Sequence, residues 1–311
     1  MNQKNCGVCW IFGVAHAVSD RLCIGYTTFG QTPDGYSPSL YTDFNLSTQS
    51  MASCFGKQHT DLPNSGPNVC NGGYISKAIE ILYPNCKNQS GYHCGAVHDQ
   101  CWKYRPFQPT STTQVLECPI TTACPNANKY DWVYDRMYTV DYRSPIEGPG
   151  TPMISNVQAI KEEIYYNGPI VVGFNVYPDF QGYEDGIYAW NGVGSIIGGH
   201  AVSMIGWGVE NGTDYWILKN SWGKQWGTKI GKYKGYVKFK MHQCSIEREP
   251  YAPCPLYECE HAIHADVCQN WKTKCVGETP PPPTPPNSHG AKNQCINLVL
   301  LFFIVWIVFL L

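Results

Sequence analysis

A cysteine near the start of the chain stands in a pattern that suits nucleophilic chemistry. Cys9 closes the run Cys6-Gly7-Val8-Cys9, is followed by Trp10, and precedes apolar residues at helical spacing. The pattern predicts a loop that turns sharply into an amphipathic helix, with the thiol at the amino end. A helix N-terminus lowers the pKa of a thiol, and the thiolate is the form that attacks. We therefore interpret Cys9 as a nucleophile; the alternative is a structural or disulfide-bonded cysteine.

A thiol that cleaves an acyl bond needs partner groups, and the chain offers one of each kind. His200 could hold the thiol proton and later deliver it to a leaving amine. Asn220 could orient the imidazole, and Trp222 could shield their hydrogen bond from water. Gln3 and the backbone N–H of Cys9 could donate to the oxyanion. Each residue alone has a structural alternative, such as a turn asparagine, but their joint presence favours catalysis.

The elements that must position these side chains fall into two parts. Residues 1 to about 110 are rich in turn formers and predict a helical lobe stapled by disulfides, with helices after Cys9 and at 74–82. From about 130 to 252, short β-rich runs separated by Gly and Asn predict an antiparallel β lobe. Its strands are expected at 170–176, 201–207 and 215–218.

One helix should lead into these strands. Residues 157–165 have helical periodicity, with Ser155 or Asn156 as the N-cap and Asn167-Gly168-Pro169 as a stop signal. We expect this helix to deliver the chain directly to the strand at 170–176.

Three further segments follow the predicted two-lobed domain at 1–252. Cys254, Cys259, Cys268 and Cys275 predict a small knot at 253–276 with two disulfides; the alternative is a metal site that adds the histidines at 261 and 264. A proline-rich stalk is expected at 277–294. Residues 295–311 are hydrophobic and predict either a short transmembrane helix or the tail of a lipid-anchor signal.

Composition describes a folded protein. The chain has 311 residues, of which 43% are hydrophobic and 15% charged. The net charge of -2 gives no reason to expect nucleic acid or an acidic membrane surface as a partner. The basic run from Lys229 to Lys240 is interleaved with aromatic residues, and we interpret it as the solvated face of a hairpin.

The cysteine content indicates an oxidising compartment. Sixteen cysteines and acceptor motifs for N-linked glycans at Asn45, Asn88 and Asn211 favour the secretory pathway and disulfide bonds. If Cys9 stays free, an odd number remains, so at least one other thiol should lack a partner in this chain. The polar residues after Met1 do not form a signal peptide, so we expect an incomplete N-terminus.

These motifs together resemble the papain-like cysteine proteases. The signature is Cys6-Gly7-Val8-Cys9-Trp10, in which Val8 replaces a smaller residue. The resemblance covers residues 1 to about 250 and is strongest to cathepsin B-like peptidases, through the stretches at 19–24 and 206–213. It also includes Cys70-Asn71-Gly72-Gly73, Gly199-His200-Ala201 and Asn220-Ser221-Trp222-Gly223. The resemblance implies an α+β fold of two lobes with the active site in the cleft between them.

The resemblance also implies a role for each matching residue. Cys9 would form a thioester, with His200 as acid and base, Asn220 as its orienter and Gln3 as oxyanion donor. Other residues would bind substrate: Gly72 and Gly73 by pairing with its backbone, Trp222 at the site, and Tyr74, Ala201 and Glu249 around the second residue before the cut. The alternative for Glu249 is a surface carboxylate.

The same resemblance sets the expected partners. With an acidic residue at the position of Glu249, the enzyme would accept Arg or Phe as the second residue before the cut. Peptides and proteins would be substrates, and cystatin-like proteins or propeptides would be inhibitors. No metal and no other cofactor is expected.

Two departures from the family bear on activity. No histidine lies between Cys101 and Cys124, where cathepsin B carries a histidine pair that binds a substrate's C-terminal carboxylate, so release of dipeptides is not expected. Relatives also begin with a signal peptide, a propeptide and a cysteine that pairs with the position of Cys23. Cys23 is therefore a candidate for the unpaired thiol.

We predict a cysteine endopeptidase of the secretory pathway, a lysosome-like compartment or the cell surface, anchored to a membrane by its tail. The alternative is a membrane-displayed binding protein that keeps the fold without turnover, or a gene fragment that lacks the signal peptide and propeptide. The complete set of four catalytic residues favours the enzyme.

Overall fold

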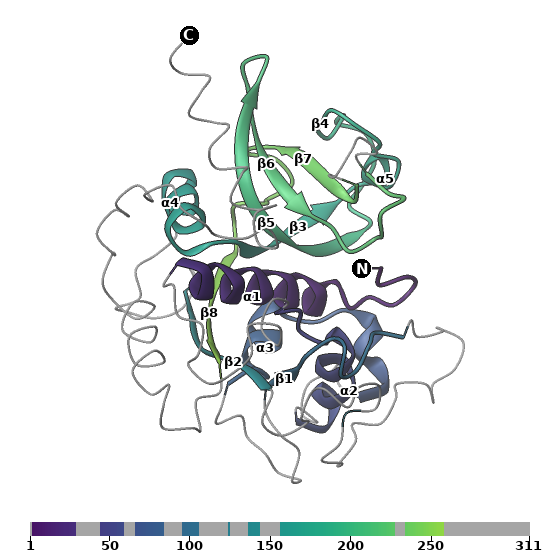
Figure 1. Ribbon diagram of the computed structural model, residues 1–311. Coiled ribbons are helices and arrows are strands. Elements are labelled where there is room, and N and C mark those ends of the chain that lie inside the picture. Colours follow the sequence, from purple (N-terminus) through teal and green to yellow (C-terminus); the bar gives the residue numbers. More distant parts are fainter. Residues whose placement is uncertain are drawn as a thin grey trace.

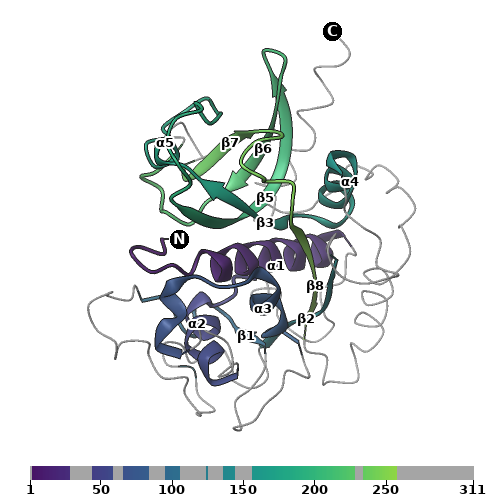
Figure 2. The same cartoon turned by 180° about the vertical axis from the view of Figure 1, so that it is seen from behind.

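A long central helix organises the molecule. The computed structural model describes residues 2–28, 44–58, 66–83, 95–105, 124, 136–143, 156–227 and 234–257. Helix α1 (Cys9–Thr28) runs between two groups of elements (Figure 1). Strands β3 to β7 lie on one side of α1 together with α4 and α5, while α2 and α3 lie on the other side, and the view from behind shows the same division (Figure 2). The predicted α+β fold of two lobes is confirmed.

Helix α1 is buried around nearly its whole circumference. Its residues that are at most 1% exposed are Trp10, Ile11, Phe12, Val14, Ala15, Ala17, Val18 and Arg21. Helices that are apolar on every side lie inside a protein, whereas an amphipathic helix covers its surface. The prediction of an amphipathic helix is therefore wrong in this respect, because α1 packs against β5 of the β lobe, against α2 and α3 of the helical lobe, and against β8.

The helical lobe is built from short elements. They are α2 (Thr48–Gln58), the 3-10 helix η1 (Gly66–Asn71), α3 (Ile75–Glu80), β1 (Ala96–Val97) and β2 (Arg136–Arg143). The helix predicted at 74–82 is confirmed as α3, with Tyr74 as its extended N-cap residue. The sequence did not predict α2, β1 or β2.

The β lobe contains the strands that the sequence predicted. Its elements are α4 (Val157–Asn167), β3 (Ile170–Val176), α5 (Pro178–Gln181), β4 (Ile187–Tyr188), β5 (Gly198–Glu210), β6 (Thr213–Lys219) and β7 (Tyr236–Lys240), followed by β8 (Pro250–Tyr257). The full strand order is β1-β2-β8-β3-β5-β6-β7-β4. All neighbouring strands are antiparallel except β4 and β7.

Helix α4 shows why its sequence pattern was informative. The side chain of Asn156 accepts a hydrogen bond from the backbone N–H of Ala159 at 2.9 Å, so Asn156 rather than Ser155 is the N-cap. Gly168 ends the helix with φ of 95°, a backbone conformation that favours glycine. Pro169 then leads into β3.

Strand β8 joins the two lobes. Pro250 and Tyr251 pair with β3, and the remainder of the strand pairs with β2. Cys254 is buried in this second part, aligned with Asp141 of β2. Residues 253–257 thus extend the sheet, although the sequence assigned them to the cysteine-rich knot.

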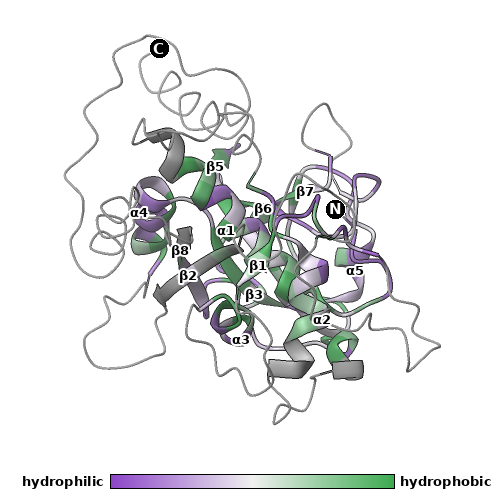
Figure 3. Cartoon of the chain, turned by 60° about the horizontal axis from the view of Figure 1, so that its bottom comes forward, coloured by the Kyte–Doolittle hydropathy of each residue, from purple (hydrophilic) through white to green (hydrophobic). Residues whose placement is uncertain are grey.

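The apolar core consists of two clusters. One surrounds α1 and reaches α2, α3 and β1, and the other lies between the β sheet and the helices α4 and α5. Figure 3 colours the chain by hydropathy and shows green, hydrophobic stretches along α1, β3 and β5. The elements that carry Cys9 and His200, α1 and β5, are therefore supported by apolar packing.

A buried arginine links α1 to α4, to the turn between α4 and β3, and to β8. Arg21 is 1% exposed and forms an ion pair with Glu163 of α4 at 2.7 Å. Its guanidinium also donates to the carbonyls of Gly168, Pro169 and Pro253 at 3.0, 2.6 and 3.0 Å. One side chain thereby holds α1, the turn between α4 and β3, and β8 in a fixed arrangement.

Several sequence predictions lie outside the described residues. They are the glycan acceptor at Asn88, the rest of the cysteine-rich knot from 258, its alternative metal site, the stalk at 277–294 and the hydrophobic segment at 295–311. None of the helices within the described ranges combines the length and apolar character that a membrane span requires.

Candidate active site

The loop before α1 is fixed to the helical lobe by covalent and backbone bonds. Cys6 forms a disulfide with Cys70, whose two Cα atoms are 4.5 Å apart, and the N–H of Gly7 donates to the Cys70 carbonyl at 2.8 Å. A Cβ atom at Gly7 would lie 2.4 Å from that carbonyl oxygen, so the approach requires glycine. Val8 is fully buried, so its size is accommodated by the core. The loop thus places Cys9 as the first residue of α1.

Strand β5 carries the imidazole of His200, the predicted partner of Cys9. The Nε2 atom of His200 lies 2.8 Å from Oδ1 of Asn220, which also accepts the N–H of Ser221 at 2.8 Å. The backbone N–H of Ala201, the residue after His200, is among the groups that lower the pKa of the Cys9 thiol. Because Nε2 is engaged by Asn220, Nδ1 is the ring nitrogen left for the thiol. The structure therefore brings the predicted Cys, His and Asn together.

Aromatic rings enclose the imidazole. The ring centroid of Trp222 lies 4.8 Å from that of His200, and Phe174 packs edge-on from the neighbouring strand with a centroid separation of 5.6 Å. His200 is only 6% exposed as a result. Trp222 thus lies against the imidazole, where the sequence prediction that it shields the His200–Asn220 hydrogen bond from water can apply.

Burial favours the neutral forms of both reacting groups. It raises the pKa of the Cys9 thiol, although backbone N–H groups of Ala201, Trp10 and Cys9 itself act in the opposite direction. It also lowers the pKa of His200 to about 4, while the hydrogen bond to Asn220 raises it. The expected lowering of the thiol pKa by the helix N-terminus is therefore present but smaller than the effect of burial.

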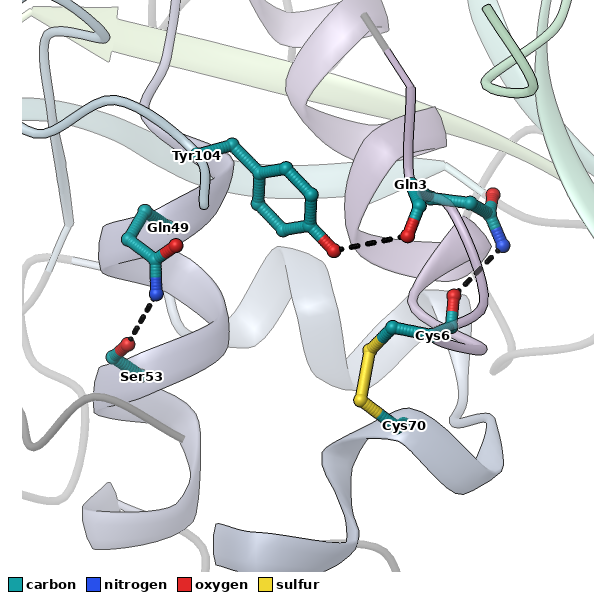
Figure 4. Close-up of a disulfide and its surroundings, with 6 residues drawn as sticks. All are labelled: Gln3, Cys6, Gln49, Ser53, Cys70 and Tyr104. Atoms are coloured by element: carbon teal, nitrogen blue, oxygen red, sulfur yellow. Dashed lines mark hydrogen bonds between the residues drawn. A yellow bond between two sulfur atoms is a disulfide. The ribbon is translucent and has the colours of Figure 1, made fainter. Parts of the chain in front are cut away.

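Gln3 is held at the junction of the two lobes. Its Nε2 atom donates to the Cys6 carbonyl at 3.0 Å, and its Oε1 atom accepts from the hydroxyl of Ser221. Its backbone N–H donates to the Ser221 carbonyl at 2.8 Å, and its carbonyl accepts from the hydroxyl of Tyr104 at 3.1 Å (Figure 4). These contacts fix the direction of the amide, and the second hydrogen on Nε2 can serve an oxyanion.

The glycines after Cys70 form an open edge beside the nucleophile. No atom lies within 4 Å of a Cβ built on Gly72, whose φ is 94°, whereas a Cβ on Gly73 would lie 2.4 Å from the Trp10 ring. Tyr74 follows with 63% of its surface exposed. Gly72 thus leaves room for an extended peptide, and Gly73 lets the chain lie against the first turn of α1.

The acidic candidate lies on the far side of β3 from Ala201. Ala201 is aligned with Gly173, and the neighbouring Val172 is aligned with Pro250, the residue after Glu249. A Cβ on Gly173 would lie 3.8 Å from the Ile75 side chain, so the absence of a side chain at Gly173 leaves room beside Ile75. Sequence reasoning did not single out Gly173, because its place opposite Ala201 depends on strand register.

Two carboxylates, Glu247 and Glu249, lie just before β8, and of these two only Glu249 is available to a ligand. Glu247 accepts from the indole N–H of Trp216 at 2.7 Å and from the backbone N–H of His242 at 2.8 Å. The Glu249 side chain is 45% exposed and forms a loose ion pair with the neighbouring Arg248 at 3.8 Å. Glu247 therefore stabilises the fold, whereas Glu249 can face a substrate.

The states of Cys23 and Cys244 bear on the prediction that a second thiol lacks a disulfide partner. Cys23 is disulfide-bonded, so the prediction that it is the unpaired thiol is wrong. Cys244 is a partly buried free thiol, and burial together with nearby carboxylates raises its pKa to about 11. Cys101 is bonded to Cys124, which closes the segment that lacks histidine.

Sequence reasoning also missed two residues that hold Gln3. Ser221 accepts the backbone N–H of Gln3 and donates its hydroxyl to the Gln3 side chain. It follows Asn220 directly, so its position beside a predicted catalytic residue was an available signal. Tyr104 lies in a segment with no recognisable motif. Only the fold shows that it contacts Gln3.

Comparison with known proteins identifies relatives over most of the chain. The papain family cysteine protease domain matches residues 1–254. Cathepsin B-like cysteine proteinase 5 of Caenorhabditis elegans is 33% identical, covering 82% of this chain and 69% of the relative. The gut-specific cysteine proteinase of the same species is 33% identical over 79% of this chain and 65% of the relative.

A solved structure is also similar. The proCathepsin B S9 from Trypanosoma congolense has 26% identity and a TM-score of 0.58, and the alignment covers 82% of this chain and 70% of that one. The chain spans 69% and 65% of the two curated relatives above. The shared fold and the matched domain lead to one conclusion: the chain belongs to the papain family of cysteine proteases, among relatives that are cathepsin B-like.

Proposed function

We propose that this protein is a cysteine endopeptidase that hydrolyses peptide bonds through a thioester on Cys9. The observation that carries the proposal is the pairing of His200 with Asn220 at 2.8 Å, next to an Ala201 N–H that lowers the pKa of the Cys9 thiol. Gln3 supplies the fourth group. Family membership supports the same reaction class.

The reaction follows from these positions in two stages. The Cys9 proton passes to Nδ1 of His200 as the sulfur bonds to the carbonyl carbon of the substrate. Gln3 Nε2 and the Cys9 N–H stabilise the oxyanion. His200 then protonates the leaving amine as the C–N bond breaks, which leaves a thioester. Water, deprotonated by His200, cleaves the thioester and releases the acid and the Cys9 thiol.

The neutral resting state is compatible with this sequence. Burial penalises each charge separately, but proton transfer from Cys9 to His200 creates a thiolate and an imidazolium together. Their mutual attraction offsets part of that penalty in a site of low dielectric. Asn220 stabilises the imidazolium further, because its carbonyl oxygen accepts from Nε2.

The substrate's second residue before the cut would occupy the space around Gly173, Ala201 and Tyr74. Glu249 supplies a carboxylate at the edge of this space, which supports acceptance of Arg, while the apolar walls support Phe. Tyr74 is exposed in the absence of substrate and would be covered by it.

Exposed apolar residues precede strand β5, which carries His200. Val193, Ile196 and Ile197 are 70%, 52% and 51% exposed, and they lie within the five residues before Gly198-Gly199-His200. Exposed apolar side chains gathered at a site favour a binding surface. We expect them to accept apolar residues that follow the cut.

The experiment uses an internally quenched peptide with blocked termini and Arg second before the cut. The wild-type protein should cleave it, Cys9→Ala should abolish cleavage, and Cys244→Ser should leave the rate unchanged. Cleavage that survives Cys9→Ala would refute the assignment. A folded wild-type protein that binds the peptide without cleaving it would favour the alternative, a binding protein without turnover.

The blocked C-terminus also tests the mode of cleavage. The absence of histidine between Cys101 and Cys124 supports internal cleavage, so blocked and free C-termini should give similar rates. A strong preference for a free carboxylate would contradict endopeptidase action.

Localisation and attachment rest on the sequence. Disulfides at Cys6–Cys70 and Cys101–Cys124 support a secretory or lysosome-like compartment. Attachment to a membrane through residues 295–311, control by cystatin-like proteins or a propeptide, and glycosylation at Asn211 belong to the same proposal. Partition of the expressed protein into a detergent phase, and its loss on deletion of 295–311, would test the anchor.

A further inference from the structure

A tyrosine of the helical lobe holds the segment that carries the oxyanion donor. The Tyr104 hydroxyl donates to the Gln3 carbonyl at 3.1 Å, and Figure 4 shows the phenol pointing at that oxygen. The other donor to the same carbonyl is the Cys6 N–H, at the longer distance of 3.4 Å. Tyr104 therefore supplies the better of the two hydrogen bonds described at this oxygen.

The β lobe holds Gln3 from the opposite side. Ser221 accepts the Gln3 backbone N–H and donates its hydroxyl to the Gln3 side chain. Gln3 is thus tied to one lobe through Ser221 and to the other through Tyr104. Loss of either tie would let the short segment before α1 shift toward the opposite lobe.

Tyr104 itself is firmly mounted. Its ring packs edge-on against Phe12 of α1, with centroids 4.9 Å apart, and Phe12 is fully buried. The next residue, Arg105, donates its backbone N–H at 2.8 Å to Gln49 of α2, whose side chain is in turn bonded to Ser53 at 2.8 Å (Figure 4). Burial also raises the pKa of Tyr104, so the phenol remains a donor.

We infer that Tyr104 is a positioning residue that sets the place of the Gln3 amide relative to the Cys9 N–H. The inference rests on the proposed function, in which Gln3 donates to the oxyanion. Complete loss of an oxyanion donor lowers kcat by about 100- to 1000-fold. Misplacement of a donor that is still present should cost less, about tenfold.

The test compares two reactions of the same thiol in Tyr104→Phe. Peptide hydrolysis passes through an oxyanion, whereas alkylation of Cys9 by iodoacetamide does not. We expect kcat for hydrolysis to fall about tenfold, with KM and the alkylation rate changed by less than about twofold. A peptide aldehyde, which forms a tetrahedral adduct, should bind about tenfold more weakly. Equal loss in hydrolysis and alkylation would show general damage and overturn the inference.

Matched variants keep the outcome interpretable. Tyr183→Phe removes a hydroxyl that donates to the Gly186 carbonyl at 2.7 Å in the β lobe, and it should change neither reaction. Replacement of Tyr104 by 4-aminophenylalanine retains a donor and should restore hydrolysis, including where Tyr104→Phe folds poorly. Absence of rescue would overturn the inference.

A double-mutant cycle separates this inference from the proposed function. If Gln3→Ala slows hydrolysis, adding Tyr104→Phe should have little further effect, because Tyr104 acts through Gln3. Additive losses would overturn the role of Tyr104 alone. If Gln3→Ala leaves hydrolysis unchanged, the assignment of Gln3 as oxyanion donor fails, and the inference fails with it.

Discussion

His200 combines a buried position with a single strong partner, and this combination should set the acid limit of activity. A base whose pKa is lowered stays neutral until the pH falls to that lower value. Burial lowers the pKa of His200 to about 4, so the base is lost only as the pH falls through about 4. We expect kcat/KM for a substrate with Phe second before the cut to fall on the acid side with a midpoint near this value.

The hydrogen bond to Asn220 gives this prediction a control. The bond raises the pKa of His200, so Asn220→Ala should move the acid limb to lower pH while reducing kcat. Stopped-flow assays at each pH, with activity checked after return to neutral pH, separate titration from unfolding. An acid limb above about pH 6, the range of an unperturbed histidine, would contradict the role of burial.

Glu249 should decide the preference between basic and aromatic substrates. Glu249→Ala removes the available carboxylate, and kcat/KM for a substrate with Arg second before the cut should fall about tenfold, because a partly exposed charged hydrogen bond is lost. The value for a Phe substrate should change by less than about twofold. Glu162→Ala, which removes an exposed carboxylate on α4, serves as the control. Equal losses on both substrates would exclude Glu249 from the pocket.

Sequence alone could identify the residues whose chemistry is local. Cys9, His200 and Asn220 stand in motifs whose side-chain types state their roles, and the structure brings them together. Gly173 and Tyr104 could not be found in this way. Their significance depends on strand register and on a contact between positions 3 and 104, which no spacing in the sequence specifies.

At the scale of elements, the ion pair between Arg21 and Glu163 should make a large contribution to stability. Arg21→Met would remove the charge partner of the buried Glu163 carboxylate and one donor from each of three carbonyls. We expect the free energy of unfolding to fall by about 3–5 kcal/mol, measured by urea denaturation. Lys77→Met, which breaks a more exposed pair with Glu80, should cost less than about 1 kcal/mol. Equal effects would show that the buried network has no special weight.

The elements also show where periodicity succeeds and fails. The helix α4 was predictable because Asn156 and Gly168 mark its ends with their own chemistry. The environment of α1 was not, because burial on both sides depends on a second lobe that lies far along the chain. Strand β8 was missed for a similar reason: it is divided between two partners, and neither half has a clear period.

For the molecule as a whole, the site is a product of the junction between lobes. The helical lobe contributes Cys9 and the Gly72 edge, and the β lobe contributes His200 and Asn220. Gln3 is bonded to both. Any change that alters the relative position of the lobes should therefore slow peptide hydrolysis more than it slows alkylation of the Cys9 thiol.

The most direct test of the central claim is the site and stoichiometry of labelling by a peptide epoxide. Within the part of the chain that the structure describes, Cys9 in the site and Cys244 in the β lobe are both thiols without a disulfide and can be compared. We predict one adduct per molecule, located by mass spectrometry on Cys9, with peptide hydrolysis lost in proportion to labelling and adduct formation abolished by Cys9→Ala. An adduct on Cys244, or full hydrolysis by protein labelled on Cys9, would contradict this account.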